Sequence, residues 1–192
     1  MDHDETFSKL LPAALVFEGG LAVLACLLAW LFGLKHPPLT QIPYDPRAIL
    51  WGVAATFPLL AGLWLSTRYP IGPLKDLKRV VQELIVPMFR RATLLDFALV
   101  SLVAGVGEEM LFRGFVQEGL TQLSGNEWLA LGLASVLFGL AHPITATYAV
   151  LAVLIGAYLG LLWLLSGNLL APMITHALYD FGALVYLVRG LD

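Results

Sequence analysis

The sequence predicts an all-α protein, a polytopic transmembrane helix bundle of about six spans with one amphipathic connector helix. Hydrophobic residues make up 59% of the 192-residue chain and charged residues only 13%, which is about half the charged fraction of a typical soluble domain. The mean hydropathy is +0.82. Because several apolar runs approach the roughly 20 residues that a helix needs to cross a bilayer, we expect an integral, multi-pass membrane protein.

The N-terminal part, residues 1–92, contains two apolar runs and a basic segment. The runs lie at about 10–34 and 48–66, with a polar, proline-rich break between them. Residues 67–92 differ, because six basic side chains accompany apolar residues at helical spacing. This pattern predicts an amphipathic helix on the membrane surface or a cytosolic connector.

The C-terminal part, residues 93–190, begins with a predicted capping box, in which Asp96 follows Thr93 by three positions. We expect this helix bundle to form one integrated membrane domain with the N-terminal part. Four further apolar runs lie at about 94–120, 128–142, 145–165 and 169–188.

Basic residues are unevenly distributed between the loops. With about six crossings, Lys9, the six basic residues of 67–92 and Arg189 share one side, whereas Lys35 and Arg47 lie on the other. The positive-inside rule then predicts that both termini are cytoplasmic. In a bacterium the membrane would be the inner, or cell, membrane.

Composition also excludes some classes of function. Cys26 is the only cysteine, which rules out an intramolecular disulfide and a thiolate metal cluster. The chain has no basic stripe with interleaved aromatic residues, so we expect no nucleic-acid partner.

Two adjacent glutamates, Glu108 and Glu109, lie inside an apolar run, with Arg113 four positions after the second. A carboxylate in lipid is costly, so this pair needs partners inside a helix bundle. Glu109 and Arg113 share a helix face and can form an ion pair, which could also be a purely structural clamp. Glu108 points about 100° away. A desolvated carboxylate of this kind can serve as a general base near neutral pH.

Two histidines in later apolar runs are candidate partners. His142 lies just before Pro143, and His176 shares a helix face with Asp180, four residues on. Each has a simpler interpretation, a helix cap for His142 and a packing hydrogen bond for His176 with Asp180. Their joint occurrence favours a site, because intramembrane ionisable residues are rare and face the bundle interior. Glu18, in the first run, is not assigned to catalysis.

Three motifs occur in order on separate predicted spans: Glu108-Glu109-x-x-x-Arg113, Phe138-x-x-x-His142 and His176-x-x-x-Asp180. This ordered trio resembles the motifs of the CPBP family, the CAAX proteases and bacteriocin-processing enzymes (also called the Abi family). The members of that family include the type II CAAX prenyl endopeptidases. The resemblance covers about residues 93–190.

The resemblance implies roles for the first two motifs. Glu108 and His142 would activate a water for attack on a peptide carbonyl, while Glu109 and Arg113 would form a supporting pair that orients the site.

The third motif departs from a common form of the family. The resemblance implies that His176 and the residue at position 180 stabilise the oxyanion, and many members have Asn there where this chain has Asp180. An ionised Asp accepts hydrogen bonds but does not donate them. Asp180 could therefore orient His176, stay protonated or bind a metal.

The motifs are compatible with a site that holds a metal and with one that does not. Family members are often named metalloproteases, although a metal-independent glutamate mechanism has also been proposed for them. Glu108, His142, His176 and Asp180 are zinc ligands by residue type, but the chain has no His-Glu-x-x-His motif. The expected cofactor is either none or a divalent metal such as zinc.

Together these features predict an intramembrane endopeptidase that hydrolyses a peptide bond of a membrane-associated or lipid-modified polypeptide. Its expected partners are this substrate and the lipid bilayer. Two other classes remain: a non-catalytic bacteriocin-immunity or partner-binding membrane protein, and a proton-coupled transporter. The chain shows neither an inverted repeat nor paired broken helices, which disfavours transport.

Overall fold

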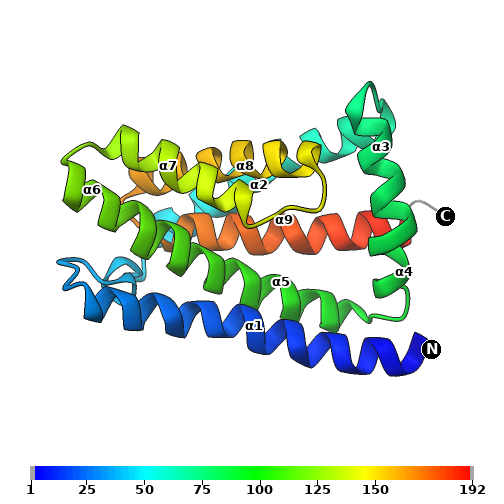
Figure 1. Cartoon of the computed structure of the whole chain (residues 1–192), viewed down its shortest axis with the longest axis horizontal. Helices are drawn as coiled ribbons and strands as arrows, with labels where there is room; N and C mark the ends of the chain where they lie inside the picture. Colours follow the sequence, from blue (N-terminus) through cyan, green and yellow to red (C-terminus); the bar gives the residue numbers. More distant parts are fainter. Residues whose placement is uncertain (1–2, 191–192) are drawn as a thin grey trace.

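The computed structural model describes the backbone of residues 3–190 and the side chains of residues 10–190. All secondary structure in this range is helical (Figure 1), as predicted. The elements are α1 (His3–Leu31), η1 (Pro38–Gln41), α2 (Pro46–Arg68), α3 (Pro73–Val80), η2 (Val81–Ile85), α4 (Val86–Phe89), α5 (Leu94–Glu109), η3 (Met110–Gln117), α6 (Glu118–Ser124), α7 (Glu127–Leu140), α8 (Ala146–Ser166) and α9 (Leu170–Arg189).

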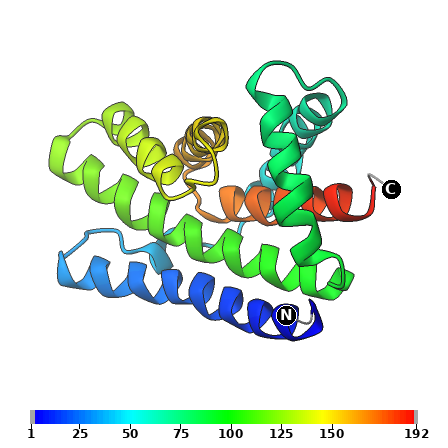
Figure 2. The same ribbon diagram turned by 45° about the vertical axis from the view of Figure 1, so that its right-hand side comes forward.

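Helix α5 runs through the middle of the bundle. It packs against α1 on one side and α9 on the other, while α7 packs on α8 and α2 packs on α9. Figures 1 and 2 show α1 and the α7–α8 pair on opposite sides of α5. The α5 helix continues without a break through the wider, π-helical turns of η3 into α6. This long helix therefore contacts most of the bundle.

Close contact of α5 with its two neighbours depends on glycine. A Cβ atom at Gly105 would lie 2.8 Å from the backbone nitrogen of Ala177 in α9. A Cβ atom at Gly107 would overlap the carbonyl oxygen of Glu18 in α1. Membrane helices associate through such small residues, because lipid leaves no hydrophobic driving force between them. These two glycines fix how near α1 and α9 come to the end of α5.

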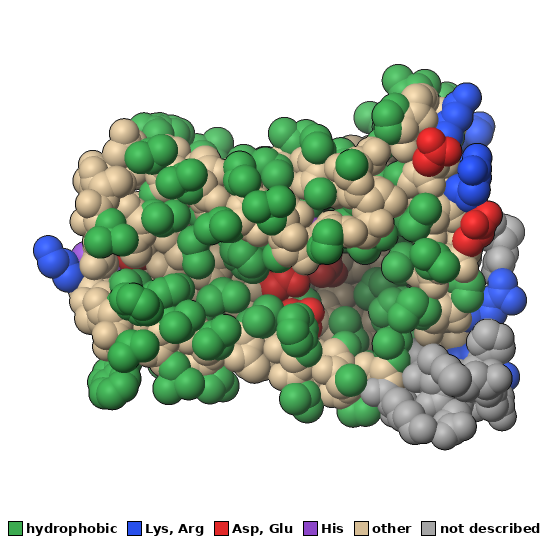
Figure 3. Space-filling view, viewed as in Figure 1, with side chains coloured by type: hydrophobic (Ala, Val, Ile, Leu, Met, Phe, Trp, Pro, Cys, Tyr) green, Lys and Arg blue, Asp and Glu red, His purple; other side chains and the backbone are tan. Residues whose placement is uncertain are grey.

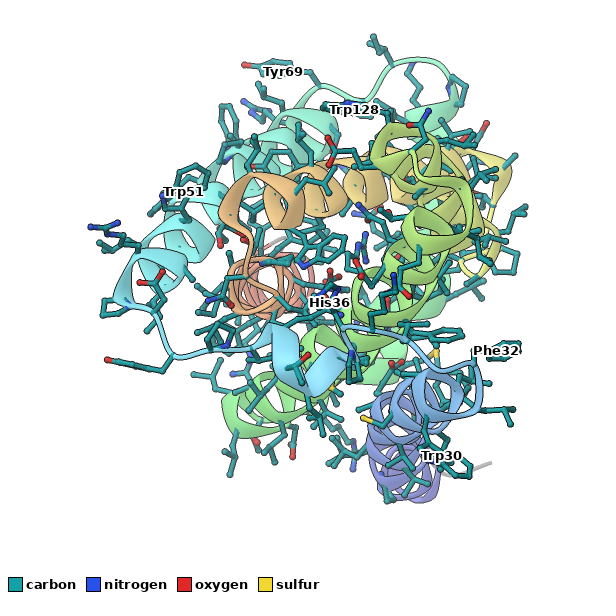
Figure 4. The ribbon with its side chains drawn as sticks, turned by 90° about the vertical axis from the view of Figure 1, so that its left-hand side faces the viewer. Trp30, Phe32, His36, Trp51, Tyr69 and Trp128 are labelled. Carbon is teal, nitrogen blue, oxygen red and sulfur yellow. The ribbon has the colours of Figure 1, made fainter. Side chains whose placement is uncertain are left out.

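Large apolar side chains face outward rather than into a core. Trp30 is 81% exposed and Phe57 is 66% exposed, whereas small residues such as Ala25 and Ala171 are fully buried. Figure 4 shows Trp30 and Trp51 on the outside of the bundle. This distribution is the one expected when the surrounding solvent is hydrocarbon.

The prediction of about six spans is not supported. In the described part of the chain, residues 94–124 are continuously helical, but Glu108, Glu109 and Arg113 make this stretch too charged to count as a span by composition. Helix α7 has 14 residues, fewer than the roughly 20 needed to cross a bilayer. The four helices that are long and apolar enough are Leu10–Leu31, Pro46–Arg68, Ala146–Ser166 and Leu170–Arg189.

The basic segment forms the expected amphipathic helix, which runs through α3, η2 and α4 and has no buried residue. It crosses the end of the bundle at which both ends of the described chain lie (Figure 1). Figure 3 shows most of the visible Lys and Arg side chains gathered at this end. The predicted capping box is present, with the Thr93 amide donating to Asp96 Oδ2 at 2.7 Å. It starts α5 directly after the amphipathic helix.

The contact between α1 and α5 generates a stability prediction. We expect Gly107→Ala to destabilise the folded protein by about 1–3 kcal/mol, because the added methyl group meets the Glu18 backbone and overpacks the interface. The matched control is Gly132→Ala in α7, where a Cβ atom meets nothing within 4 Å; there alanine should stabilise the helix by roughly 0.5–1 kcal/mol. Thermal unfolding in detergent, followed by size-exclusion chromatography, compares the two. If Gly107→Ala and the unmodified protein had the same melting temperature, the packing argument would be contradicted.

Candidate active site

A buried ion pair lies where α5 passes into η3. Glu109 and Arg113 are 0% and 1% exposed. Arg113 Nη1 donates to Glu109 Oε1 at 2.7 Å, which is the ion pair that their spacing predicts. Arg113 Nη2 donates to the carbonyl oxygen of Gly156 in α8 at 2.9 Å, and the guanidinium carbon lies 4.5 Å from the ring centroid of Phe138 in α7. One arginine thus connects three helical segments.

His176, on α9, lies between two carboxylates. Its Nδ1 is 2.8 Å from Glu109 Oε1, and its Nε2 is 3.4 Å from Asp180 Oδ2 one turn further along the helix. Glu109, paired with Arg113, accepts hydrogen bonds, so the Nδ1 atom of His176 carries a proton. This contact fixes the orientation of the ring and leaves Nε2 facing Asp180.

Glu108 finds its partner on a different helix, as its position on α5 requires. Glu108 Oε2 lies 3.6 Å from His142 Nε2. His142 follows the end of α7, and its Nδ1 atom lies 2.7 Å from the carbonyl oxygen of Phe138. A carbonyl only accepts, so Nδ1 carries the proton and Nε2 of the neutral ring presents a lone pair toward Glu108.

The backbone at this point has an unusual helical form. The π-helical turns of η3 begin at Met110, directly after Glu109, and the Glu118 amide donates back to the Arg113 carbonyl five residues earlier. The consecutive residues Phe112, Arg113 and Gly114 are all buried in this segment. Single π-helical segments inside α-helices occur frequently at functional sites.

The residues predicted to form one site therefore come together. Glu108 and Glu109 come from α5, His142 from the turn after α7, and His176 and Asp180 from α9. Electrostatic interactions also join Glu108 to His176 and Asp180. Figure 3 shows acidic side chains at a hollow in the middle of an otherwise apolar face.

One acidic residue beside the site, Glu18, was not assigned to it from the sequence. Glu18 on α1 interacts electrostatically with His176 and Asp180, and its Oε2 atom is buried without a hydrogen-bond partner. Its partners lie far away in the sequence and on other helices. The only local signal was an acidic residue inside an apolar run, which does not identify a neighbour.

The candidate zinc ligands considered from the sequence are paired with one another in this structure. Among the described residues, no three His, Cys, Asp or Glu side chains are grouped so that they could hold a metal ion. Both ring nitrogens of His176 face carboxylate oxygens, and His142 Nδ1 faces a carbonyl. The donors form two histidine–carboxylate pairs, and we assign no chemical step to a metal.

Comparison with known proteins gives one match. Residues 90–182 match the family model described as Type II CAAX prenyl endopeptidase Rce1-like, and this segment contains the three motifs from Glu108 to Asp180. No curated protein and no solved structure matches the chain. The resemblance to the CPBP proteases is thereby confirmed, and it rests on residues 90–182, which are similar to the Rce1-like type II CAAX prenyl endopeptidases.

Proposed function

We propose that this protein is an intramembrane endopeptidase that cleaves a prenylated or otherwise lipid-modified polypeptide, using a water activated by Glu108 and His142. The observation that carries the proposal is the pairing of these two side chains, 3.6 Å apart, from separate helices of an apolar bundle. The pair lies within the segment that matches a prenyl endopeptidase family.

The geometry of the pair suits water activation. A separation of 3.6 Å is too long for a good direct hydrogen bond. It suits a water oxygen that contacts both groups at about 2.8 Å, with one hydrogen directed to each. Glu108 then accepts the proton as the water oxygen attacks the carbonyl carbon, and His142 Nε2 orients the water. Both groups are desolvated, which strengthens these interactions.

The tetrahedral intermediate needs a donor for its oxyanion. His176 Nε2 supplies one when it carries a proton, and the carboxylate of Asp180 at 3.4 Å favours that proton. Glu109 holds the opposite edge of the ring through Nδ1. In this proposal Glu109 and Arg113 position His176 and do not contact the substrate.

The substrate enters from the lipid side in this proposal. Figure 3 shows one group of acidic side chains in the middle of an apolar face, apart from those at the basic end of the bundle. A polypeptide anchored by a lipid chain is already confined to the bilayer and reaches such a site by lateral diffusion.

We further propose that both termini and the amphipathic helix face the cytoplasm. Arg68, Lys75, Lys78 and Arg79 lie at the end of the bundle that both described chain ends share (Figure 1). Basic residues are retained on the cytoplasmic side of membranes. The membrane is the inner, cell membrane if the protein is bacterial.

The central test is Glu108→Gln, which keeps the shape of the side chain but removes its basic carboxylate. We expect peptide hydrolysis to fall on the order of 10²-fold or more, the usual size of a general-base contribution. Cleavage of a fluorogenic prenylated CAAX peptide by purified protein measures it. Glu127→Gln, at an exposed position in α7, is the control and should cleave normally. Unchanged turnover by Glu108→Gln would favour a non-catalytic, partner-binding protein.

Arg113→Ala tests whether the buried ion pair stabilises the folded protein in addition to supporting activity. It leaves Glu109 buried without its cation, and breaking a buried pair costs about 3–5 kcal/mol. We therefore expect less folded protein in the membrane as well as lower activity. Arg79→Ala is the control, because Arg79 is exposed and its nearest Asp76 oxygen is 3.6 Å away; exposed pairs contribute little. Quantitative immunoblotting of membranes gives abundance, and wild-type abundance of Arg113→Ala would contradict the buried-pair argument.

Sidedness is testable with reporters. A reporter fused after the C-terminus and one inserted at Gly72 should both read cytoplasmic, because Arg189 precedes the first position and Arg68 and Lys75 flank the second. One inserted at Gly125, in the turn between α6 and α7, should read on the opposite side, since that turn lies at the other end of the bundle (Figure 1). Paired fluorescent-protein and alkaline-phosphatase fusions measure this. A cytoplasmic signal at Gly125 would refute the orientation.

A further inference from the structure

Helix α1 lies outside the segment that matches the family model. Its apolar stretch, Leu10–Leu31, contains a single acidic residue, Glu18. In lipid an ionisable residue of this kind is costly and faces the bundle interior or a cavity. The three family motifs do not account for an acidic side chain at this position in the apolar helix.

The backbone holds Glu18 beside the candidate site. The Glu18 carbonyl oxygen lies so close to Gly107 that no Cβ atom fits there, and Gly107 immediately precedes Glu108. One residue further along α1, a Cβ atom at Gly19 would lie 3.6 Å from a Val103 methyl group. The α1–α5 contact thus places Glu18 at the level of Glu108 in the bundle.

The carboxyl group of Glu18 has an unused oxygen. Its Oε2 atom is buried and has no hydrogen-bond partner, while the group interacts electrostatically with His176 and Asp180. Among the described residues, no ion pair joins Glu18 to a Lys or Arg side chain. Burial and the nearby Asp180 carboxylate favour the neutral acid of Glu18, whereas the positive charge of protonated His176 acts in the opposite direction. The O–H of the neutral acid is a hydrogen-bond donor.

Glu18 and His142 approach the site from opposite sides. Helix α1 lies on one side of α5 and the α7–α8 turn on the other (Figures 1 and 2). Glu108 directs Oε2 toward His142, so the proposed water lies on the His142 side. A peptide bond placed over Glu108 would have the water on one side and the Glu18 acid on the other.

Peptide hydrolysis needs a proton donor at this second position. An amine leaves as a neutral molecule only if its nitrogen gains a proton while the carbon–nitrogen bond breaks. Glu108 has accepted a proton from water by then, but its carboxyl group faces His142. The site therefore lacks a donor on the α1 side unless Glu18 provides it.

We propose that Glu18 is the general acid of the hydrolysis, an inference that rests on the proposed function. Water gives one proton to Glu108, and its oxygen bonds to the carbonyl carbon. The carbon–nitrogen bond then breaks, its electron pair stays on nitrogen, and Glu18 gives that nitrogen its proton. The products are a carboxylic acid and an amine. Transfer of the proton from Glu108 to the Glu18 carboxylate restores the starting state.

The experiment compares Glu18→Gln on two substrates that differ at the scissile bond. One is a fluorogenic farnesylated CAAX peptide with the normal amide, and the other carries a thioester at the same bond. A thiol ionises near pH 8.5, so its thiolate leaves without a donor. We expect Glu18→Gln to lower kcat for the amide by about 10²-fold or more and to leave thioester cleavage within about threefold of the unmodified protein.

Two controls complete the design. Glu108→Gln should lose both activities, because both substrates need the activated water. Glu127→Gln should keep both. Melting in detergent shows whether Glu18→Gln folds, and Glu18→Asp, which retains an acid, should recover part of the amide activity if the glutamine variant is destabilised.

The outcomes are distinct. A large loss for the amide with an intact thioester rate establishes the general acid. Equal losses on both substrates, or no loss on either, would overturn this assignment while leaving the endopeptidase in place. If the unmodified protein cleaves neither substrate, the proposed function fails, and the role of Glu18 fails with it.

Discussion

The buried contact between Glu109, Arg113 and His176 is the interaction on which the remaining structure depends. Glu109 Oε1 accepts from both the guanidinium and the imidazole, at 2.7 and 2.8 Å. Arg113 also reaches the backbone of α8 and the Phe138 ring of α7. One carboxylate oxygen and one guanidinium therefore join α5 and η3 to α7, α8 and α9. Such charges are tolerable inside a membrane protein only when they are paired in this way.

This network also determines what the neighbouring groups can do. Because His176 donates from Nδ1 to Glu109, only its Nε2 edge remains for chemistry. Phe138 contacts both histidines. Its carbonyl oxygen lies against His142 Nδ1, and its ring centroid lies 4.5 Å from that of His142 and 6.1 Å from that of His176. The same aromatic ring lies against Arg113. The Glu109–Arg113 pair and the proposed Glu108–His142 pair are thus both in contact with Phe138.

Much of this arrangement could be predicted from local patterns, and the rest could not. Four-residue spacing on a helix correctly predicted the contacts of Glu109 with Arg113 and of His176 with Asp180, because such residues share a face. The Thr93 capping box is equally local. The count of about six spans is not supported, because hydropathy treats 94–120 and 128–142 as ordinary crossings, whereas one contains buried charges and the other forms a short helix.

Contacts between distant helices carry no comparable local signal. The pairing of Glu108 with His142 was expected only because intramembrane charges need partners and because the motifs resemble a known family. Glu18 illustrates the limit, since its position depends on the close approach that Gly107 allows between α1 and α5. In a sequence, a glycine one residue before a glutamate can serve many structural purposes. That Gly107 allows close packing of α1 is seen only when the opposing backbone is known.

Side-chain exposure separates the positioning pair Glu109–Arg113 from the groups around the proposed water and oxyanion. The Glu109 and Arg113 side chains are 0% and 2% exposed, whereas those of Glu108, His142 and Asp180 are 11%, 22% and 33% exposed. A charge that only positions others gains from complete burial, because the low dielectric strengthens its hydrogen bonds. A group that exchanges protons with water or substrate must remain reachable. Glu109 and Arg113 lie in the interior of the bundle, whereas Glu108, His142 and Asp180 lie at its rim. His176 lies between them and contacts Glu109 and Asp180.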